Sequence, residues 1–108
     1  MELRHLRYFQ AVADELSFTR AATRLRVAQS AVSAQIQDLE NELGVVLLER
    51  SRRRVRLTAA GQTFNEAAER ILRSVEEASR QAGANSASQV TTRIPLPPPP
   101  ATAFSKTG

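Results

Sequence analysis

The chain has 108 residues, a formal net charge of +4 and a hydrophobic content of 42%, which suits one small domain. Aromatic residues make up only 5%, so the core must be aliphatic. Because the chain holds no cysteine and a single histidine, composition excludes a disulfide framework and a Cys/His zinc site. No apolar run approaches a membrane span and no signal-peptide pattern opens the chain, so we expect a soluble cytoplasmic protein.

Arginine dominates the positive charge: of 15 basic residues all but Lys106 are arginine. The planar guanidinium pairs with phosphate better than an ammonium group does, so this bias favours an anionic partner. A codon preference for arginine explains the bias equally well, and charge alone therefore decides little.

Helical periodicity begins near the N-terminus and predicts a first helix over residues 3–15, with Leu6 and Val12 among its apolar positions. Ser17 can then cap a second helix, because its hydroxyl can accept a hydrogen bond from a first-turn amide. The apolar residues of that helix recur at i, i+3, i+4 and i+7. They are Phe18, Ala21, Ala22 and Leu25.

Residues 26–28 form the predicted turn into a third helix, which ends at Gly44, a residue that readily adopts the left-handed conformation. One face of this helix is apolar. Its members are Val32, Ile36, Leu39 and Leu43.

The other face of the third helix carries small or amide side chains near its N-terminus, and the acids come only later. Such a face after a short capped helix and a tight turn is typical of a recognition helix in a DNA major groove. Gln29, at its start, can pair with adenine through both groups of its amide. Taken alone, these polar residues fit a merely solvated face better; their place after the turn favours DNA. The predicted contacts are Gln29, Ser30, Ser33, Ala34, Gln35 and Gln37.

Two β-prone runs, residues 45–50 and 55–57, flank a basic tip and predict a short hairpin. A basic finger beside a recognition helix can reach the neighbouring minor groove or its phosphates, although adjacent arginines can also be merely solvated. The predicted wing contacts are Arg52, Arg53 and Arg54. Candidate contacts to the DNA backbone, which set register without reading sequence, are Thr19, Arg20, Arg24, Arg50 and Thr58.

Thr58 can cap a fourth helix over residues 59–82, in which apolar residues alternate at spacings of three and four from Gly61 onward. This pattern over three heptads indicates a coiled-coil dimer seam, although an amphipathic helix lying on its own domain would look similar. The predicted interface residues are Phe64, Ala68, Ile71, Val75, Ala78 and Ala82.

Periodicity ends at residue 83, and residues 83–108 are expected to form a disordered tail with a proline-rich stretch at residues 95–100. Nothing in the chain groups a nucleophile, a base or metal ligands. His5 lacks Asp, Ser or Cys partners nearby in sequence and is expected to be a solvated or core-edge histidine, not a catalytic one. We therefore predict no enzyme activity, no cofactor and no metal.

The motifs together are specific. The stretches LRHLRYF at 3–9, SFTRAA at 17–22, AQSAVS at 28–33, LENELG at 39–44 and VRLTAAG at 55–61 resemble the N-terminal domain of LysR-type bacterial transcriptional regulators. The resemblance covers residues 1–82. It implies a homodimer joined through the fourth helix, with two recognition helices in successive major grooves of a dyad site. Gln29, Ser30, Ser33 and Arg53 match positions that contact DNA in that family.

The chain departs from the family pattern at several places. Ala28 stands where Ser or Thr is frequent, which removes a helix cap worth about 1 kcal/mol. Ala34 replaces a frequent Arg and Leu48 a common Phe. The family's ligand-sensing domain is missing where the tail begins, so no small-molecule inducer site is expected in this chain.

The predicted fold class is mainly α: a winged helix-turn-helix of three helices and a two-stranded wing over residues 1–58, then a long dimerisation helix over residues 59–82. The predicted function is sequence-specific binding of double-stranded DNA as a homodimer, in a cytoplasmic, nucleoid-associated transcription regulator. The alternative is a truncated interaction module that dimerises with little DNA binding of its own.

Overall fold

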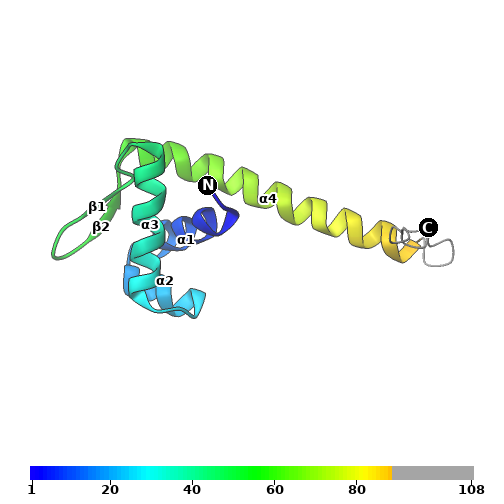
Figure 1. Cartoon of the computed structure of the whole chain (residues 1–108), viewed down its shortest axis with the longest axis horizontal. Helices are drawn as coiled ribbons and strands as arrows, with labels where there is room; N and C mark the ends of the chain where they lie inside the picture. Colours follow the sequence, from blue (N-terminus) through cyan, green and yellow to red (C-terminus); the bar gives the residue numbers. More distant parts are fainter. Residues whose placement is uncertain (89–108) are drawn as a thin grey trace, which may run out of the picture. The chain divides into compact units, whose positions relative to one another are not determined.

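A computed structural model describes residues 1–88; the proline-rich stretch and the rest of the expected tail from residue 89 lie outside the described residues. The elements are α1 (Leu3–Glu15), α2 (Phe18–Leu25), α3 (Gln29–Leu43), β1 (Leu48–Arg50), β2 (Val55–Leu57) and α4 (Ala59–Ser88) (Figure 1). The chain divides into two compact units after Val75, and the first unit holds α1, α2, α3, the two strands and the first part of α4. This mainly helical fold with a two-stranded wing confirms the predicted class.

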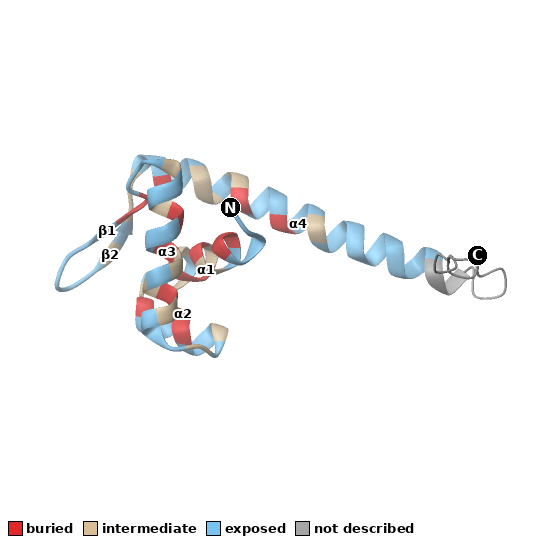
Figure 2. Cartoon of the chain, in the orientation of Figure 1, coloured by how far each residue is buried: buried red, intermediate tan, exposed pale blue. Residues whose placement is uncertain are grey.

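The core of the first unit lies between α1, α2 and α3 (Figure 2). Helical spacing places one apolar stripe of each helix toward the other two, and the wing base closes the core through Leu47 and Leu48. The largest fully buried side chains are Phe9, Val12, Val32, Ile36, Leu39 and Leu47.

The helix ends follow local chemistry. The Ser17 hydroxyl accepts a hydrogen bond from the Arg20 amide at 3.0 Å, as predicted, and Gly44 ends α3 at a φ of 73°. Ala28 gives α3 no side-chain cap. Leu16 and Arg26 end α1 and α2 at φ values of 51° and 62°, a conformation that costs a residue with a Cβ about 1–2 kcal/mol.

The wing is an antiparallel hairpin in which Leu48 pairs with Leu57 and Arg50 with Val55. Its first strand begins at Leu48, later than the run from residue 45 suggested. The pairing strand has only three residues, and the amide of Leu47 bonds instead to the Glu40 carboxylate of α3.

The start of α4 is held against the base of the wing. The Thr58 hydroxyl caps the helix by accepting from the Gly61 amide at 2.9 Å, while the Thr58 amide donates to the Leu47 carbonyl at 2.9 Å. A Cβ on Gly61 would lie 2.1 Å from that carbonyl oxygen. Only glycine fits there, so Gly61 belongs to this contact and not to the beginning of the dimer stripe.

α4 extends to Ser88, past the expected end at Ala82. Adding one more residue to an existing helix costs little, and the alanines after Gly83 are good helix formers, so Gly83 does not stop it. No helix within residues 1–88 is long and apolar enough to cross a membrane.

Candidate nucleic-acid interface

An open groove lies between the start of α2, the start of α3 and the wing. Segments from three separate parts of the sequence meet there because the α1–α3 core and the hairpin base hold them in place. Eight of the predicted contact residues line it: Thr19, Arg20, Gln29, Ser33, Arg50, Arg52, Arg53 and Arg54.

The N-terminal half of α3 presents the polar face that the sequence indicated. Gln29, Ser30 and Ala34 are exposed and Ser33 is half-buried, whereas Val32 on the opposite side has no exposed surface. Because Ser and Ala are small, this face allows a close approach of another surface.

Thr19 of α2 orients Gln29. The threonine hydroxyl donates to the Gln29 side-chain oxygen at 3.2 Å, which holds the amide at the mouth of the groove. The side chain also carries an NH₂ group with two further donors. The arrangement therefore suits a side chain that reads hydrogen-bonding edges.

The other two predicted amide readers make contacts inside the protein. The side-chain oxygen of Gln35, which is half-buried, accepts from the Arg4 Nε of α1 at 3.4 Å. Gln37 is exposed, and its Nε2 donates to the Asn41 side chain one turn later at 3.1 Å. Neither lines the groove, so Gln29 is the glutamine best placed at it.

The tip of the wing gathers exposed positive charge. Ser51 closes the turn: its amide donates to the Arg54 carbonyl at 2.9 Å, and its hydroxyl oxygen accepts from the Arg54 amide at 3.2 Å. Arg52, Arg53 and Arg54 are all exposed. The nearby acid Glu49 pairs with Arg56 at 3.3 Å, so it does not offset the tip directly.

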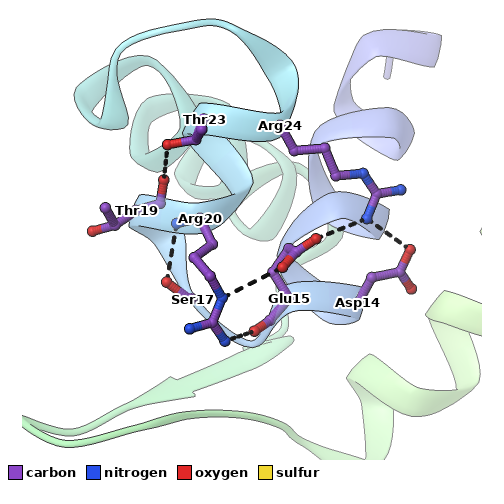
Figure 3. A network of polar contacts seen from close by, with 7 residues as sticks. All are labelled: Asp14, Glu15, Ser17, Thr19, Arg20, Thr23 and Arg24. Atoms are coloured by element: carbon purple, nitrogen blue, oxygen red, sulfur yellow. Dashed lines mark hydrogen bonds and ion pairs between the residues drawn. The ribbon is translucent and has the colours of Figure 1, made fainter.

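Arg20 and Arg24 of α2 pair with acids at the end of α1 (Figure 3). Arg24 lies 3.1 Å from Asp14 and 3.5 Å from Glu15, and Arg20 lies 3.4 Å from the Glu15 carboxylate while donating to its backbone carbonyl at 2.8 Å. These partners do not follow from the sequence pattern, because they join residues of two different helices. Such exposed pairs contribute only about 0–1 kcal/mol, so phosphate could replace the acids at small cost.

The two remaining backbone candidates have different environments. The Arg50 guanidinium stacks over the Phe18 ring, 4.3 Å from its centroid, which holds this charge beside the groove. The Thr58 hydroxyl instead donates to the Val46 carbonyl at 2.7 Å and lies outside the groove. These hydrogen bonds within the protein give Thr58 a structural role at the junction of the wing and α4.

The apolar stripe of α4 has one part that packs within the chain and one part that is largely exposed. Phe64 meets Phe9 edge-on, with ring centroids 5.5 Å apart, and Ala68 is fully buried against Leu6 and Leu72. These two predicted dimer residues thus pack against α1 of their own chain. Ile71 is 44% exposed, Val75 is half-buried, and Ala78 and Ala82 are exposed.

His5 is buried, and its Nδ1 accepts the Glu2 amide at 2.9 Å at the start of α1, which is a structural role. Within residues 1–88 no group of three or more acidic, His or Cys side chains could hold a metal ion.

The chain is similar in sequence to known bacterial regulators. Residues 3–62 match the family described as "Bacterial regulatory helix-turn-helix protein, lysR family". The chain is 56% identical over 82 residues to the Hca operon transcriptional activator HcaR of Escherichia coli, covering 76% of this chain and 28% of that protein. It is 53% identical over 77 residues to the regulator BenM of Acinetobacter baylyi, covering 71% and 25%. The chain thus spans about a quarter of the length of these relatives.

The fold is also similar to that of solved DNA-binding domains. The BenM DNA-binding domain in complex with catB site 1 DNA superposes with a TM-score of 0.78 at 48% identity, covering 80% of this chain and 97% of that one. The CbnR DNA-binding domain–DNA complex gives a TM-score of 0.76 at 48% identity, covering 80% and 99%. With the winged helix-turn-helix and the groove described above, these matches place the chain in the LysR family of bacterial regulatory helix-turn-helix proteins.

Proposed function

We propose that this chain binds double-stranded DNA in a sequence-specific manner as a homodimer, with α3 in the major groove and the wing tip at the neighbouring minor groove. The groove carries the proposal, because it brings Gln29 and Ser33 of α3 to the same opening as the arginines of the wing. Amide and hydroxyl groups suit base edges, and guanidinium groups suit phosphates and a narrow minor groove.

Within this proposal the residues divide into two roles. Gln29, Ser30 and Ser33 read bases, with Gln29 positioned by Thr19 to pair with adenine. The positive side chains contribute affinity and register. These are Arg20, Arg24, Arg50, Arg52, Arg53 and Arg54.

The dimer uses the exposed part of the α4 stripe. Ile71 and Val75 in the first unit, with Ala78 and Ala82 in the second, offer apolar or small side chains at heptad spacing. A two-fold dimer requires a dyad site whose half-sites lie on one face of the DNA, one helical turn or a multiple apart.

The names of the relatives, which are those of transcriptional regulators, support a role in transcription. We infer that this chain acts on transcription in the cytoplasm, on the nucleoid. The relatives in complex with DNA support this inference for the DNA-binding part.

The test begins with selection of duplexes from a random pool, followed by titration of a selected dyad site and of random-sequence duplex at two salt concentrations. We expect tighter binding to the dyad site and weaker binding to both duplexes at the higher salt. Sedimentation of the same protein measures the dimer. A stable dimer with no measurable affinity for either duplex would contradict the proposal and favour the interaction-module alternative.

A further inference from the structure

The wing is anchored on α3 through a carboxylate. Glu40 lies in the C-terminal part of that helix and is half-buried. One of its carboxylate oxygens, Oε2, accepts the amide of Leu47 at 2.8 Å and the amide of Leu48 at 3.1 Å. A single acidic side chain therefore holds the two residues at which the wing begins.

The other end of the hairpin is fastened to the same place. The carbonyl of Leu47 accepts the amide of Thr58 at 2.9 Å, and the Thr58 hydroxyl donates to the neighbouring Val46 carbonyl at 2.7 Å. Thr58 directly follows β2. The two ends of the wing thus meet at the peptide groups around Leu47, and Glu40 is the α3 side chain that ties this point to the recognition helix.

Beyond this base the wing makes few contacts with the rest of the domain: Val55 and Leu57 pack at the edge of the core, and Arg50 stacks over Phe18. The strands have three residues each, and Leu48 is the one fully buried strand residue while Glu49 and Arg50 are exposed. A two-stranded hairpin of this length is at best marginally stable without further packing. Because the arginine tip lies at the far end, a small change of angle at the base moves the tip much further.

We propose that Glu40 is a positioning residue for DNA binding: it sets the direction of the wing relative to α3, so that the arginine tip and Gln29 engage DNA together. This inference rests on the proposed function. It assigns a favourable role to an acid in a domain that binds a polyanion, which is the opposite of what its charge alone predicts.

The sign of the effect makes the test sharp. Removing a negative charge from the protein should strengthen DNA binding if the long-range field dominates. Glu40→Ala and Glu40→Gln remove the same charge, but only Gln keeps an oxygen that can accept the two amides. The pair therefore separates the hydrogen bonds from the charge. Asp38, exposed on the same helix, supplies the matched control pair Asp38→Ala and Asp38→Asn.

The measurement is the affinity for random-sequence duplex DNA, because wing contacts to phosphate do not require a known operator. We expect Glu40→Ala to bind about three- to tenfold more weakly than wild type, equivalent to losing one or two ordinary hydrogen bonds. Glu40→Gln should stay close to wild type, and both Asp38 variants should bind as well as wild type or better. Equal or tighter binding by Glu40→Ala relative to Glu40→Gln would overturn the inference.

A double-mutant cycle shows whether the effect passes through the wing. If Glu40 acts by placing the tip, Arg53→Ala should cost less affinity in the Glu40→Ala background than in wild type. Fully additive losses would mean that Glu40 acts elsewhere, and would refute the positioning role.

Amide hydrogen exchange supplies a readout without DNA. In Glu40→Ala the Leu47 and Leu48 amides should exchange faster while the Val32 amide in the core keeps its protection.

If Glu40→Ala does not fold, Glu40→Asp, which keeps the charge but shortens the reach, takes its place and should also bind more weakly. If wild type itself does not bind duplex DNA, the proposed function is refuted, and amide hydrogen exchange at Leu47 and Leu48 then tests only whether Glu40 anchors the wing. If wild type binds duplex DNA and Arg53→Ala weakens this binding while Glu40→Ala does not, the proposed function stands and only the positioning role of Glu40 is refuted.

Discussion

Gly61→Ala offers a direct test of how α4 meets the wing. In an exposed helix interior this change stabilises a protein by up to about 1 kcal/mol, because alanine is the better helix former. At Gly61 the new Cβ would lie 2.1 Å from the Leu47 carbonyl oxygen and 3.2 Å from a Leu57 methyl group. The obstacle is backbone, so the helix or the strand base must shift by about an ångström to reach an ordinary contact distance.

Overpacking of this kind costs typically about 1–3 kcal/mol, which outweighs the gain in helix propensity. We expect Gly61→Ala to lower the free energy of unfolding by about 1–2 kcal/mol, measured by urea denaturation followed by circular dichroism at fixed protomer concentration. Gly83→Ala on the same helix is the matched control, since its Cβ meets nothing within 4 Å, and it should be neutral or stabilising. If both variants are equally stabilised, the close contact at Leu47 does not exist in solution.

Three further changes test the DNA interface and the strained turn. Gln29→Ala should cost about 1–3 kcal/mol on the selected site and much less on random duplex; equal losses on both would remove Gln29 from base reading. Arg53→Ala should weaken binding and flatten the dependence of affinity on salt, and an unchanged salt slope would mean that Arg53 meets no phosphate or groove. Leu16 has a left-handed backbone at φ 51°, which glycine adopts without strain, so Leu16→Gly should raise the free energy of unfolding by up to about 1 kcal/mol. A lower denaturation midpoint for Leu16→Gly than for wild type would contradict this.

Several local features follow from sequence pattern because they depend on neighbours in the chain. Ser17 caps α2 and Gly44 ends α3 as predicted, since capping needs only a side chain and an amide three residues apart or a residue that tolerates positive φ. The buried stripe of α3 likewise follows from helical spacing.

The partners of charged side chains could not be read in the same way. Asp14 and Arg24 are ten residues apart, and only the packing of α1 on α2 brings them to 3.1 Å. Heptad spacing assigns Ala68 and Ile71 to one stripe, yet periodicity does not tell whether a stripe faces its own chain or another. The fold buries Ala68 and leaves Ile71 exposed.

Sequence alone was sufficient for the helix-turn-helix, the basic wing and the family, because these depend on residue order and on spacings of a few residues. The direction of the wing was not accessible in this way. It depends on one carboxylate oxygen of Glu40 meeting the amides of Leu47 and Leu48, and on a glycine that lets α4 approach the same peptide. Such contacts arise only when separate elements pack, because hydrogen bonds and steric limits act through space and not along the chain.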